Sequence, residues 1–368
     1  MDFGLTEEQQ LLRDVTREVL SRNYDIAGYN EVIGGELGWS REVWSQLAEV
    51  GLLGLGFDPA EAGQIEIMVI MTEVGRRLTP EPVAQAALIP GGLIAEVGTD
   101  GQKALLDAVS AGETLLAFAH DEPGMRVPAG GLTTRAERKG DTWAVSGRKN
   151  PVLAGDSADK VIVTASLPDG GQGLFLVDAA AADRHSYRTF DGRRAAQFDF
   201  DSVPAEPLGS GGDAGEHIAR TVIRYQSAFC AEAVGAMEEA LELTTGYLGE
   251  RKQFGVPLSN FQTLTQRAAD MYVSLELARS MNFYAAMSIA DGRFDPVVAA
   301  RAKLQIGRSG RHIAQEAIQL HGGIGMTAEY PVGHYAARLT AIDNTFGTAD
   351  DQTRVLVANI GSYGTVSL

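Results

Sequence analysis

Two clusters in the C-terminal third of the chain combine an arginine, an aromatic ring, glutamines and paired glycines. The residues are Arg251, Phe254 and Gln262 in the first cluster and Gln319, Gly322 and Gly323 in the second. An arginine can bind a pyrophosphate in a fork, a phenylalanine ring can cover an adenine, and glycines let a backbone approach a ligand closely. The clusters therefore predict a site for the adenosine half of a dinucleotide. Each also has a structural explanation, since Arg251 complements the dipole at a helix C-terminus and the glycines can cap a helix.

The common signatures of nucleotide hydrolysis, acyl-serine chemistry and zinc catalysis are missing from the sequence. It contains no GxxxxGK(S/T), GxSxG, HExxH or CxxC pattern. The histidines that we considered as ligands lack metal-ligand spacing: His120, His312, His321 and His334. We therefore predict no metal site.

Helical and strand patterns are segregated along the chain. Thr6 and Gln9 form a capping box ahead of one helix, another begins after Ser40, and residues 66–78 form a third. Short β-rich runs follow between residues 115 and 208, and the glycine-rich residues 209–215 form a linker. This order favours an α+β architecture without alternating βαβ units.

The C-terminal part reads as helices almost throughout. Apolar residues recur every three or four positions from Ile218 to Leu241 and predict one long helix with a continuous apolar stripe. We expect further helices over residues 261–290, 296–320 and 331–344, and a short one after Ala349. Four long antiparallel helices with short connections form a bundle.

Length and composition limit the function. A chain of 368 residues exceeds the usual limit for one hydrophobic core, so two or three subdomains are expected. The net charge of −17 opposes binding to nucleic acid or to anionic membranes. The single cysteine, Cys230, cannot form an internal disulfide, and the first ten residues do not resemble a signal peptide. From the single cysteine and the N-terminal pattern we expect a reducing cytoplasm. No apolar run is long enough for a helix that spans a membrane.

The whole series of features resembles the acyl-CoA dehydrogenase family of flavoproteins. The motifs are FxLTEEQ at residues 3–9, EPG at 122–124, SGRK at 146–149, RKQFG at 251–255, QLHGGIG at 319–325 and EYPV at 329–332. The resemblance implies an α-helical domain over residues 1–112, a small β-barrel over 113–208 and a four-helix bundle over 209–368. It also implies FAD at a subunit interface. The residues implied to bind the adenosine-pyrophosphate half, with the flavin ring in the neighbouring subunit, are Arg251, Phe254, Gln262, Gln319, Gly322 and Gly323.

The catalytic base that the resemblance implies is not found. The family removes an α-proton of an acyl-CoA thioester with a glutamate while the β-hydrogen passes to flavin as hydride. The usual glutamate belongs to a YEGT motif, where this chain has Phe346. The other family position corresponds to Tyr225, with Gln226 beside it in place of an arginine. Phenylalanine cannot accept a proton, and a tyrosine with a pKa of about 10 is a poor base near neutrality. The nearby acids, which solvated faces and helix N-termini explain equally well, are Glu232, Asp343, Asp350 and Asp351.

The flavin-facing positions of the β-domain differ as well. Asp121 replaces a hydroxyl donor of the family's VTEPG motif and would repel a reduced, anionic flavin. Pro151 and Leu153 replace the tryptophan and threonine that contact the flavin ring. These departures indicate that this subunit has no working flavin-ring site of its own.

The preferred interpretation is the non-catalytic subunit of a heteromeric α2β2 actinobacterial acyl-CoA dehydrogenase that shares FAD with a catalytic partner. By resemblance, the complex desaturates an acyl-CoA in lipid metabolism, with a steroid side-chain ester as the candidate, and passes electrons to an electron-transfer flavoprotein. Two alternatives stay open: a catalytic homotetramer with another base, and a scaffold without cofactor contact. The retained Arg251, Phe254, Gln319 and Gly323 argue against the scaffold, and the missing glutamates argue against the homotetramer.

Overall fold

The computed structural model describes residues 4–125, 131–140 and 142–362. Phe3 of the FxLTEEQ motif and the outermost residues of the predicted first and last domains, 1–3 and 363–368, lie outside these ranges. The chain divides into two compact units, which we call the bundle unit (residues 4–6, 71–79 and 226–362) and the barrel unit (the described parts of 7–70 and 80–225). Two helices, α4 (Gln64–Arg76) and α8 (Gly215–Glu250), contribute residues to both units. The three-domain division stays a prediction.

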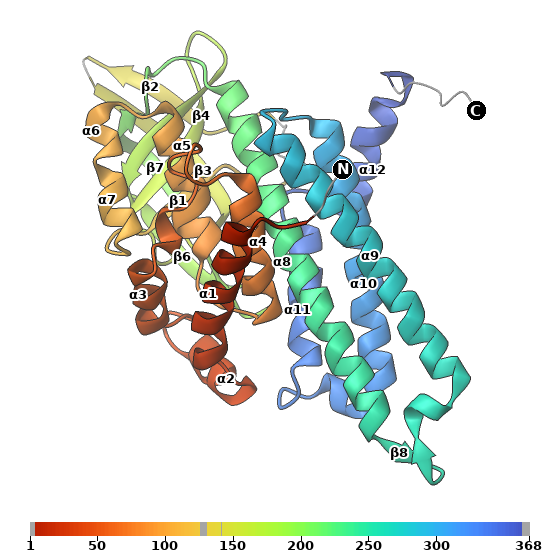
Figure 1. The fold of residues 1–368 in the computed structure, drawn as a ribbon. Coiled ribbons are helices and arrows are strands. Elements are labelled where there is room, and N and C mark those ends of the chain that lie inside the picture. Colours follow the sequence, from red (N-terminus) through yellow and green to blue (C-terminus); the bar gives the residue numbers. More distant parts are fainter. Residues whose placement is uncertain (1–3, 126–130, 141, 363–368) are drawn as a thin grey trace. The chain divides into compact units, whose positions relative to one another are not determined.

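The barrel unit begins with helices. The first starts at Glu7, directly after the predicted cap, and Ser40 caps the third by accepting from the backbone N–H of Val43 at 3.4 Å. The elements are α1 (Glu7–Asn23), α2 (Ile26–Gly34), α3 (Arg41–Glu49), η1 (Leu52–Gly54), η2 (Ala84–Leu88), α5 (Ile89–Val97), α6 (Asp100–Lys103) and α7 (Leu105–Ser110). Figure 1 shows them in red to orange.

The strands of the barrel unit close on themselves. They are β1 (Leu116–Ala119), β2 (Arg135–Lys139), β3 (Thr142–Leu153), β4 (Lys160–Ser166), β5 (Gln172–Asp178), β6 (Asp183–Arg188) and β7 (Arg194–Pro207), with η3 (Ala179–Ala181) after β5. The order β4-β2-β3-β7-β5 returns to β4, while β1 pairs with β4 and β6 pairs with β7. Closure of this circuit makes the middle of the chain a small β-barrel, as predicted. Neither β2 nor β6 was expected, because both strands are almost entirely polar and exposed.

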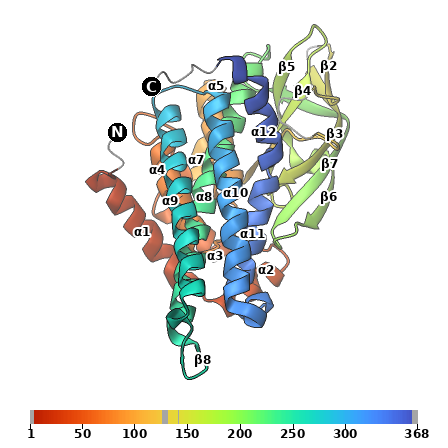
Figure 2. The ribbon, with the colours of Figure 1, turned by 90° about the vertical axis from the view of Figure 1, so that its right-hand side faces the viewer.

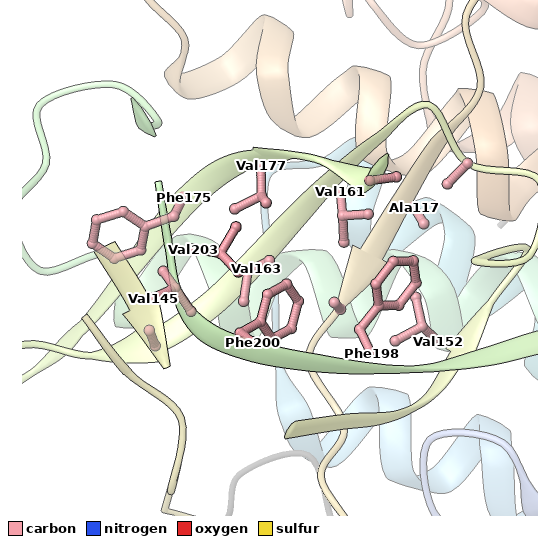
Figure 3. Packing of buried hydrophobic residues seen from close by; sticks show 14 of the residues in the cluster. Ala117, Val145, Val152, Val161, Val163, Phe175, Val177, Phe198, Phe200 and Val203 are labelled. Carbon is pink, nitrogen blue, oxygen red and sulfur yellow. The ribbon is translucent and has the colours of Figure 1, made fainter. Parts of the chain in front are cut away.

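The barrel interior is filled by small and aromatic side chains from alternate strand positions. Val145 and Val152 of β3, Val161 and Val163 of β4, and Phe198 of β7 are all fully buried (Figure 3). Because side chains on a strand alternate between its two faces, the intervening residues point outward.

The bundle unit contains the long helices. They are the C-terminal part of α8, α9 (Gln262–Ala290), α10 (Pro296–His321) and α11 (Val332–Asn344), and α9, α10 and α11 run side by side (Figure 2). Shorter elements are β8 (Lys252–Gln253), β9 (Val256–Pro257), η4 (Leu258–Asn260), η5 (Gly322–Met326), α12 (Ala349–Ala358) and η6 (Ile360–Ser362). The predicted α8 stripe from Ile218 to Leu241 is buried. In the described ranges, no helix is long and apolar enough to cross a membrane.

Within the bundle unit, α4 and α8 cross at two glycines. A Cβ on Gly75 would lie 1.8 Å from the carbonyl oxygen of Glu232, and a Cβ on Gly235 would lie 1.8 Å from that of Thr72. No side chain fits at either position. The VG pair at residues 234–235 therefore has a packing role, which allows α8 to pass close to α4.

Candidate functional site

The first predicted cluster lies where α8 ends, at the tip of the bundle unit. The backbone N–H of Arg251 donates to Tyr247 at 2.9 Å, and the carbonyl of Arg251 accepts from Leu258 at 2.8 Å across the β8–β9 hairpin. The turn of this hairpin holds Phe254 at φ 55° and Gly255 at φ 83°. Phe254 is 92% exposed, and its ring meets Phe261 edge-on at 6.1 Å. The hairpin thus presents an aromatic ring to the outside of the chain.

The second cluster lies at the same end, where α10 stops. Gly322 ends the helix at φ 65°, and a Cβ on Gly322 or Gly323 would meet nothing within 4 Å. The buried His321 lies between Tyr247 of α8 and Tyr330, with ring centroids 4.6 and 4.8 Å away. This aromatic packing brings the QLHGGIG turn next to the last turn of α8.

All six predicted adenosine-side residues are exposed. In the described part of the chain, Arg251 forms no ion pair with another residue, although it follows a helix C-terminus as the structural explanation requires. Gly322 does serve as the helix cap. The arrangement leaves the arginine and the glycine backbone free to contact a phosphate group from outside, so the clamp stays a prediction compatible with the geometry.

The position of the missing YEGT glutamate is filled by a ring. Phe346 is 7% exposed, adopts φ 53°, and packs 6.1 Å from the ring of Phe229. Its carbonyl accepts hydrogen bonds from the amides of Gln226 at 3.0 Å and Gln352 at 3.2 Å. Gln226, which occurs in place of an arginine, therefore holds the loop that carries Phe346.

The four acids considered as replacement bases do not offer a free carboxylate beside Phe346. Glu232 forms a buried bidentate pair with Arg338 at 2.6 and 2.7 Å. Asp343 accepts from Arg311 at 3.0 Å and from the backbone of Ala349 at 3.2 Å.

The other two acids belong to α12. Asp351 closes a capping box with Thr348, and Asp350 is exposed on the first turn of the helix. Helix capping accounts for the first and a solvated position for the second. The bundle unit therefore presents no substitute base among these acids.

Tyr225, at the other base position, is buried in the barrel unit. Its ring stacks on Phe118 at 5.8 Å, and its hydroxyl donates to the carbonyl of Gln85 at 3.4 Å. Burial raises the pKa of this phenol far above its usual value. Tyr225 is consequently neutral at physiological pH and cannot act as a base there.

The EPG and SGRK motifs meet in a buried ion pair of the barrel unit. The ammonium of Lys149, which is fully buried, donates to Glu122 at 2.9 Å, to the carbonyl of His120 at 2.9 Å and to Thr164 at 3.0 Å. Glu122 also accepts from the backbones of Thr133 at 2.7 Å and Thr134 at 3.0 Å. Every proton of the ammonium has an acceptor, as a buried charge requires.

The pKa shifts of the pair follow from its surroundings. Burial opposes ionisation of Glu122, but hydrogen bonds from Thr133 and Lys149 lower its pKa to about 2. Burial lowers the pKa of Lys149 to about 8, against the attraction of Glu122. The hydrogen bonds and the paired charge together outweigh burial in setting the pKa of Glu122, whereas burial outweighs pairing in setting the pKa of Lys149. Both groups stay charged at neutral pH, so the pair is a salt bridge.

Asp121, next to Glu122 in the chain, is one of the positions that the resemblance implies to face the flavin; Pro151 and Leu153 are the others. Burial raises the pKa of Asp121 to about 6, although Lys149 acts in the opposite sense. Asn150 and Pro151 oppose the single residue Gln197 in a β-bulge of the β3–β7 ladder. Pro151 is exposed and Leu153 half-buried, so neither offers the planar ring or the hydroxyl of the family.

Known proteins match over nearly the whole chain. The model of the acyl-CoA dehydrogenase N-terminal domain matches residues 6–113, and that of the C-terminal domain matches residues 217–361. This chain belongs to the acyl-CoA dehydrogenase family. The short-chain specific acyl-CoA dehydrogenase of Clostridium acetobutylicum is 29% identical over 98% of this chain and 100% of its own length. A probable acyl-CoA dehydrogenase of Bacillus subtilis, YngJ, is 27% identical over 98% of this chain and 100% of its own.

A solved structure matches with 31% identity. This relative is a variant of the Tcur3481–Tcur3483 steroid ACAD, and the match has a TM-score of 0.90 and covers 97% of this chain and 98% of that one. Acyl-CoA dehydrogenases are oxidoreductases that bind FAD. In the described residues of this chain, no group of three or more His, Cys, Asp or Glu could hold a metal ion.

The residues present fit one half of FAD better than the other. Around Gly322 and Gly323 the backbone is open, and Arg251 and Phe254 are exposed at the same end of the bundle unit, as contact with a nucleotide-pyrophosphate requires. The positions that the resemblance implies to face the flavin, which we call the flavin-facing rim, are Asp121, Pro151 and Leu153. They hold an acid, a proline and a leucine where the family uses a hydroxyl donor, a tryptophan and a threonine. This acyl-CoA dehydrogenase therefore has exposed groups that suit the adenosine side of FAD, and at the rim it has none of the hydroxyl, tryptophan and threonine side chains that the resemblance implies.

Sequence reasoning missed the contacts that hold these positions in place. EPG and SGRK served only as family markers, yet a lysine and a glutamate within two such motifs could have indicated an ion pair. Nothing in the sequence pattern indicated that Gln226 and Gln352 would both donate to the carbonyl of Phe346. Gln226 lies 120 residues away in the chain, and the local contact of Gln352, six residues away, follows no regular helical or strand spacing.

Proposed function

We propose that this chain is the non-catalytic subunit of a heteromeric FAD-dependent acyl-CoA dehydrogenase. One observation carries most of the weight: both positions at which the family places its glutamate hold buried aromatic residues, Phe346 and Tyr225. A base must reach the substrate's α-proton within hydrogen-bond distance and must be able to accept it. Neither residue meets the second condition.

The proposed role of this chain is to hold the adenosine half of a partner's FAD. When bound, FAD supplies the acceptor for the β-hydrogen of the acyl-CoA. On this chain, the guanidinium of Arg251 pairs with the pyrophosphate, the ring of Phe254 covers the adenine, and Gly322 and Gly323 let the backbone approach. Gln262 and Gln319 supply amide hydrogen bonds beside them.

The alternatives are less consistent with the contacts described above. A catalytic homotetramer needs a free acid, but Glu232, Asp343 and Asp351 are committed to ion pairs and a helix cap. A scaffold without cofactor has no use for an arginine and an almost fully exposed phenylalanine on a hairpin tip, since exposed aromatic rings cost solubility.

The proposed assembly is an α2β2 tetramer with a catalytic acyl-CoA dehydrogenase chain as partner. The likeness to the Tcur3481–Tcur3483 steroid ACAD supports both a paired assembly and a steroid-CoA substrate. An electron-transfer flavoprotein is the proposed electron acceptor. The 25% identity to a solved structure described as the electron transferring flavoprotein of Acidaminococcus fermentans is compatible with that assignment.

The test is co-expression with a related chain encoded nearby that keeps the glutamate and the flavin motif. Alone, this chain should be colourless, because the flavin-facing rim lacks its ring contacts. Together, the two chains should bind about one FAD per heterodimer, since each FAD needs a flavin pocket and a clamp from opposite chains. Absorbance of protein and flavin on the same sample gives the ratio.

Two results would contradict the proposal. A yellow homotetramer that bleaches with acyl-CoA would mean that this chain is catalytic by itself. A ratio of about two FAD per heterodimer would mean that its rim still binds flavin. Assay of the complex with a steroid side-chain CoA ester and with butyryl-CoA tests the substrate class separately, and a preference for butyryl-CoA would exclude the steroid assignment.

A further inference from the structure

His321, the last residue of α10, is buried in the tip of the bundle unit, whereas the clamp residues on either side of it in the sequence are exposed. Both nitrogens of its ring have partners. Nδ1 lies 2.8 Å from the carbonyl oxygen of Ala317, and Nε2 lies 3.2 Å from the hydroxyl of Tyr330. Because a carbonyl oxygen only accepts, we assign the proton to Nδ1, and Nε2 of the neutral ring accepts from the hydroxyl. These partners fix the orientation of the ring.

Two tyrosines enclose the ring of His321 and form with it a cluster that we call the tyrosine–histidine stack. The histidine ring centroid lies 4.6 Å from that of Tyr247 and 4.8 Å from that of Tyr330, and the two tyrosine rings lie 6.4 Å apart. Tyr247 belongs to the last turn of α8, and its carbonyl accepts from the backbone N–H of Arg251. Tyr330 lies just before α11. The stack therefore connects the end of α8, which leads to Arg251, with the chain on both sides of the glycine turn.

The glycine turn after α10 is packed against His321 on its inner side. A Cβ on Gly325 would lie 3.0 Å from the Cβ of His321, and a Cβ on Gly333 would lie 3.0 Å from the carbonyl oxygen of Gly325. Little room for a side chain remains there. A Cβ on Gly322 or Gly323, by contrast, would meet nothing within 4 Å. The backbone that is open to a ligand is therefore held from behind by His321 and by α11.

We propose that His321 is a positioning residue for the clamp, whose ring sets the distance between Arg251 after α8 and the glycines after α10. This inference rests on the proposed function, which assigns those groups to FAD. A pyrophosphate contacts an arginine and a backbone turn together only when both are held at the right separation, and groups fixed in advance bind more tightly because less motion is lost. His321 acts through Arg251 and Gly322 and needs no contact with the cofactor.

Protonation of His321 would work against this role. Burial lowers its pKa below the usual 6.5, although two backbone carbonyls favour the charged form. Among the described residues, the titratable groups that stack on the ring are Tyr247 and Tyr330, and burial, together with the charges of Tyr247 and Glu250, raises the pKa of Tyr330. The imidazole is therefore neutral above pH 6.5 and costs no stability there. As the pH falls below 6.5, proton uptake favours a loosened stack in which the histidine has its ordinary pKa, so FAD affinity should fall.

The test measures the dissociation constant of FAD by equilibrium dialysis on the complex of this chain with its catalytic partner. His321→Asn removes the ring and keeps a donor for the carbonyl of Ala317, as Asn344 donates to the carbonyl four residues earlier at 2.8 Å. It should weaken FAD binding about tenfold, which is the size of one or two aromatic contacts. His312→Asn is the matched control, because His312 also belongs to α10 but bonds Ser274 outside the stack. It should leave the affinity unchanged.

A second variant, His321→Phe, keeps a ring in the stack and cannot take up a proton. In the parent complex, FAD affinity should be lower at about pH 5.5 than at about pH 7.5, whereas the variant should lose less affinity between these values. At the higher pH, His321→Phe should bind FAD more tightly than His321→Asn does. The difference between the parent and variant profiles belongs to His321, because every other titrating group is common to both proteins.

Unchanged FAD affinity in both His321 variants would overturn the inference, and so would a loss of affinity at acid pH in His321→Phe as large as that of the parent. If His321→Asn does not assemble with the partner, the pH profile of His321→Phe decides alone. Arg251→Ala separates this inference from the proposed function. If that variant also binds FAD unchanged, the clamp itself is wrong, whereas a loss of affinity in Arg251→Ala alone refutes only the role of His321.

Discussion

Polar side chains are exposed at the tip of the bundle unit and largely buried at and beside the flavin-facing rim of the barrel unit. At the bundle tip, Arg251, Gln262 and Gln319 extend into solvent. Beside the rim, the buried Lys149 and Glu122 form an ion pair, and Asp121 of the rim is half-buried. Donors that contact an external group must be free of partners within the chain, whereas a buried ion pair satisfies its donors internally. The bundle tip therefore offers groups for binding, and the Lys149–Glu122 pair does not.

This contrast distinguishes residues whose role is to stabilise the fold from residues whose proposed role is to bind a ligand. The Lys149–Glu122 pair links the loop after β1 to the segment before β2, to β3 and to β4, so it supports the barrel whether or not flavin binds. The exposed arginine and phenylalanine contribute little to stability, since exposed side chains away from special features change it by less than about 0.5 kcal/mol. Their presence is better explained by a ligand than by folding.

The largest effect should come from breaking the buried pair. Lys149→Met leaves Glu122 as an uncompensated buried carboxylate and should lower the free energy of unfolding by about 3–5 kcal/mol. Lys160→Met is the matched control, because Lys160 and Asp178 form an exposed pair in the same barrel and such pairs contribute at most about 1 kcal/mol. Denaturant unfolding measures both. Equal losses of unfolding free energy in the two variants would mean that burial does not increase the contribution of the Lys149–Glu122 pair to stability.

At the bundle tip, Arg251→Ala should weaken FAD retention in the complex without affecting folding. Loss of a charge-assisted contact to pyrophosphate costs about 1.5–3 kcal/mol, which is roughly ten- to hundredfold in affinity. Lys252→Ala is the neighbouring control, since it removes the same charge from the next residue. Equilibrium dialysis of FAD gives the dissociation constants. If Arg251→Ala and Lys252→Ala behaved alike, Arg251 would only complement the helix dipole.

Asp121→Asn should raise stability, and only above acid pH. The folded pKa of about 6 lies above the model value of 3.8, so stability is lost as the pH rises from about 4 to 6, and the full cost of ionising the buried group applies above pH 6. Below about pH 4 both states are protonated and the cost vanishes. We expect a gain of about 1–2 kcal/mol at neutral pH, reduced from the full shift because part of the side chain reaches water.

The control for this pH dependence is Asp178→Asn. Hydrogen bonds from the backbone of Ala180 and from Lys160 lower the pKa of Asp178, so its contribution has the opposite sign and is lost as the pH falls. Unfolding curves at neutral and acid pH compare the two variants. A gain for Asp121→Asn that persisted at acid pH would exclude ionisation as its cause.

Where local signals are strong, the sequence is enough to predict the elements. Ser40 marks the start of α3, and the spacing from Ile218 to Leu241 predicts the buried stripe of α8. Strand β6 escapes prediction because its residues are all exposed and show no alternation of polar and apolar side chains. Its partner β7 pairs with it through the backbone, which leaves no trace in residue type.

In the candidate site, too, features with a local sequence signal can be predicted and features that depend on tertiary contacts cannot. The clamp residues form short motifs, so their types and spacing are enough to predict a nucleotide-pyrophosphate site, which stays a prediction. The loop around Phe346 depends on amides from residues 226 and 352, and the rim depends on a lysine from β3 reaching a glutamate after β1. The contacts of residue 226 and of the lysine are set by tertiary packing, for which a single sequence carries no periodic signal, whereas the contact of residue 352 is local.

The smallest effect should follow from restoring the missing carboxylate. In the complex, Phe346→Glu should leave turnover per heterodimer unchanged, because a base acts only when substrate and flavin are already positioned around it. The rim residues Asp121, Pro151 and Leu153 would still lack the ring contacts. The new glutamate would replace a ring packed on Phe229, so burial would raise its pKa and lower stability.

Phe346→Leu provides the control for that prediction, since it removes the ring without adding a charge. Turnover and FAD content measured on the same samples distinguish a change of chemistry from a change of folding. If Phe346→Glu doubled both quantities while Phe346→Leu changed neither, only the base would have been lost, and the rim would be competent to bind flavin. Pro151 and Leu153 would then support the flavin ring as well as a tryptophan and a threonine do. The site of this chain would differ from an intact one only by the substitution at position 346.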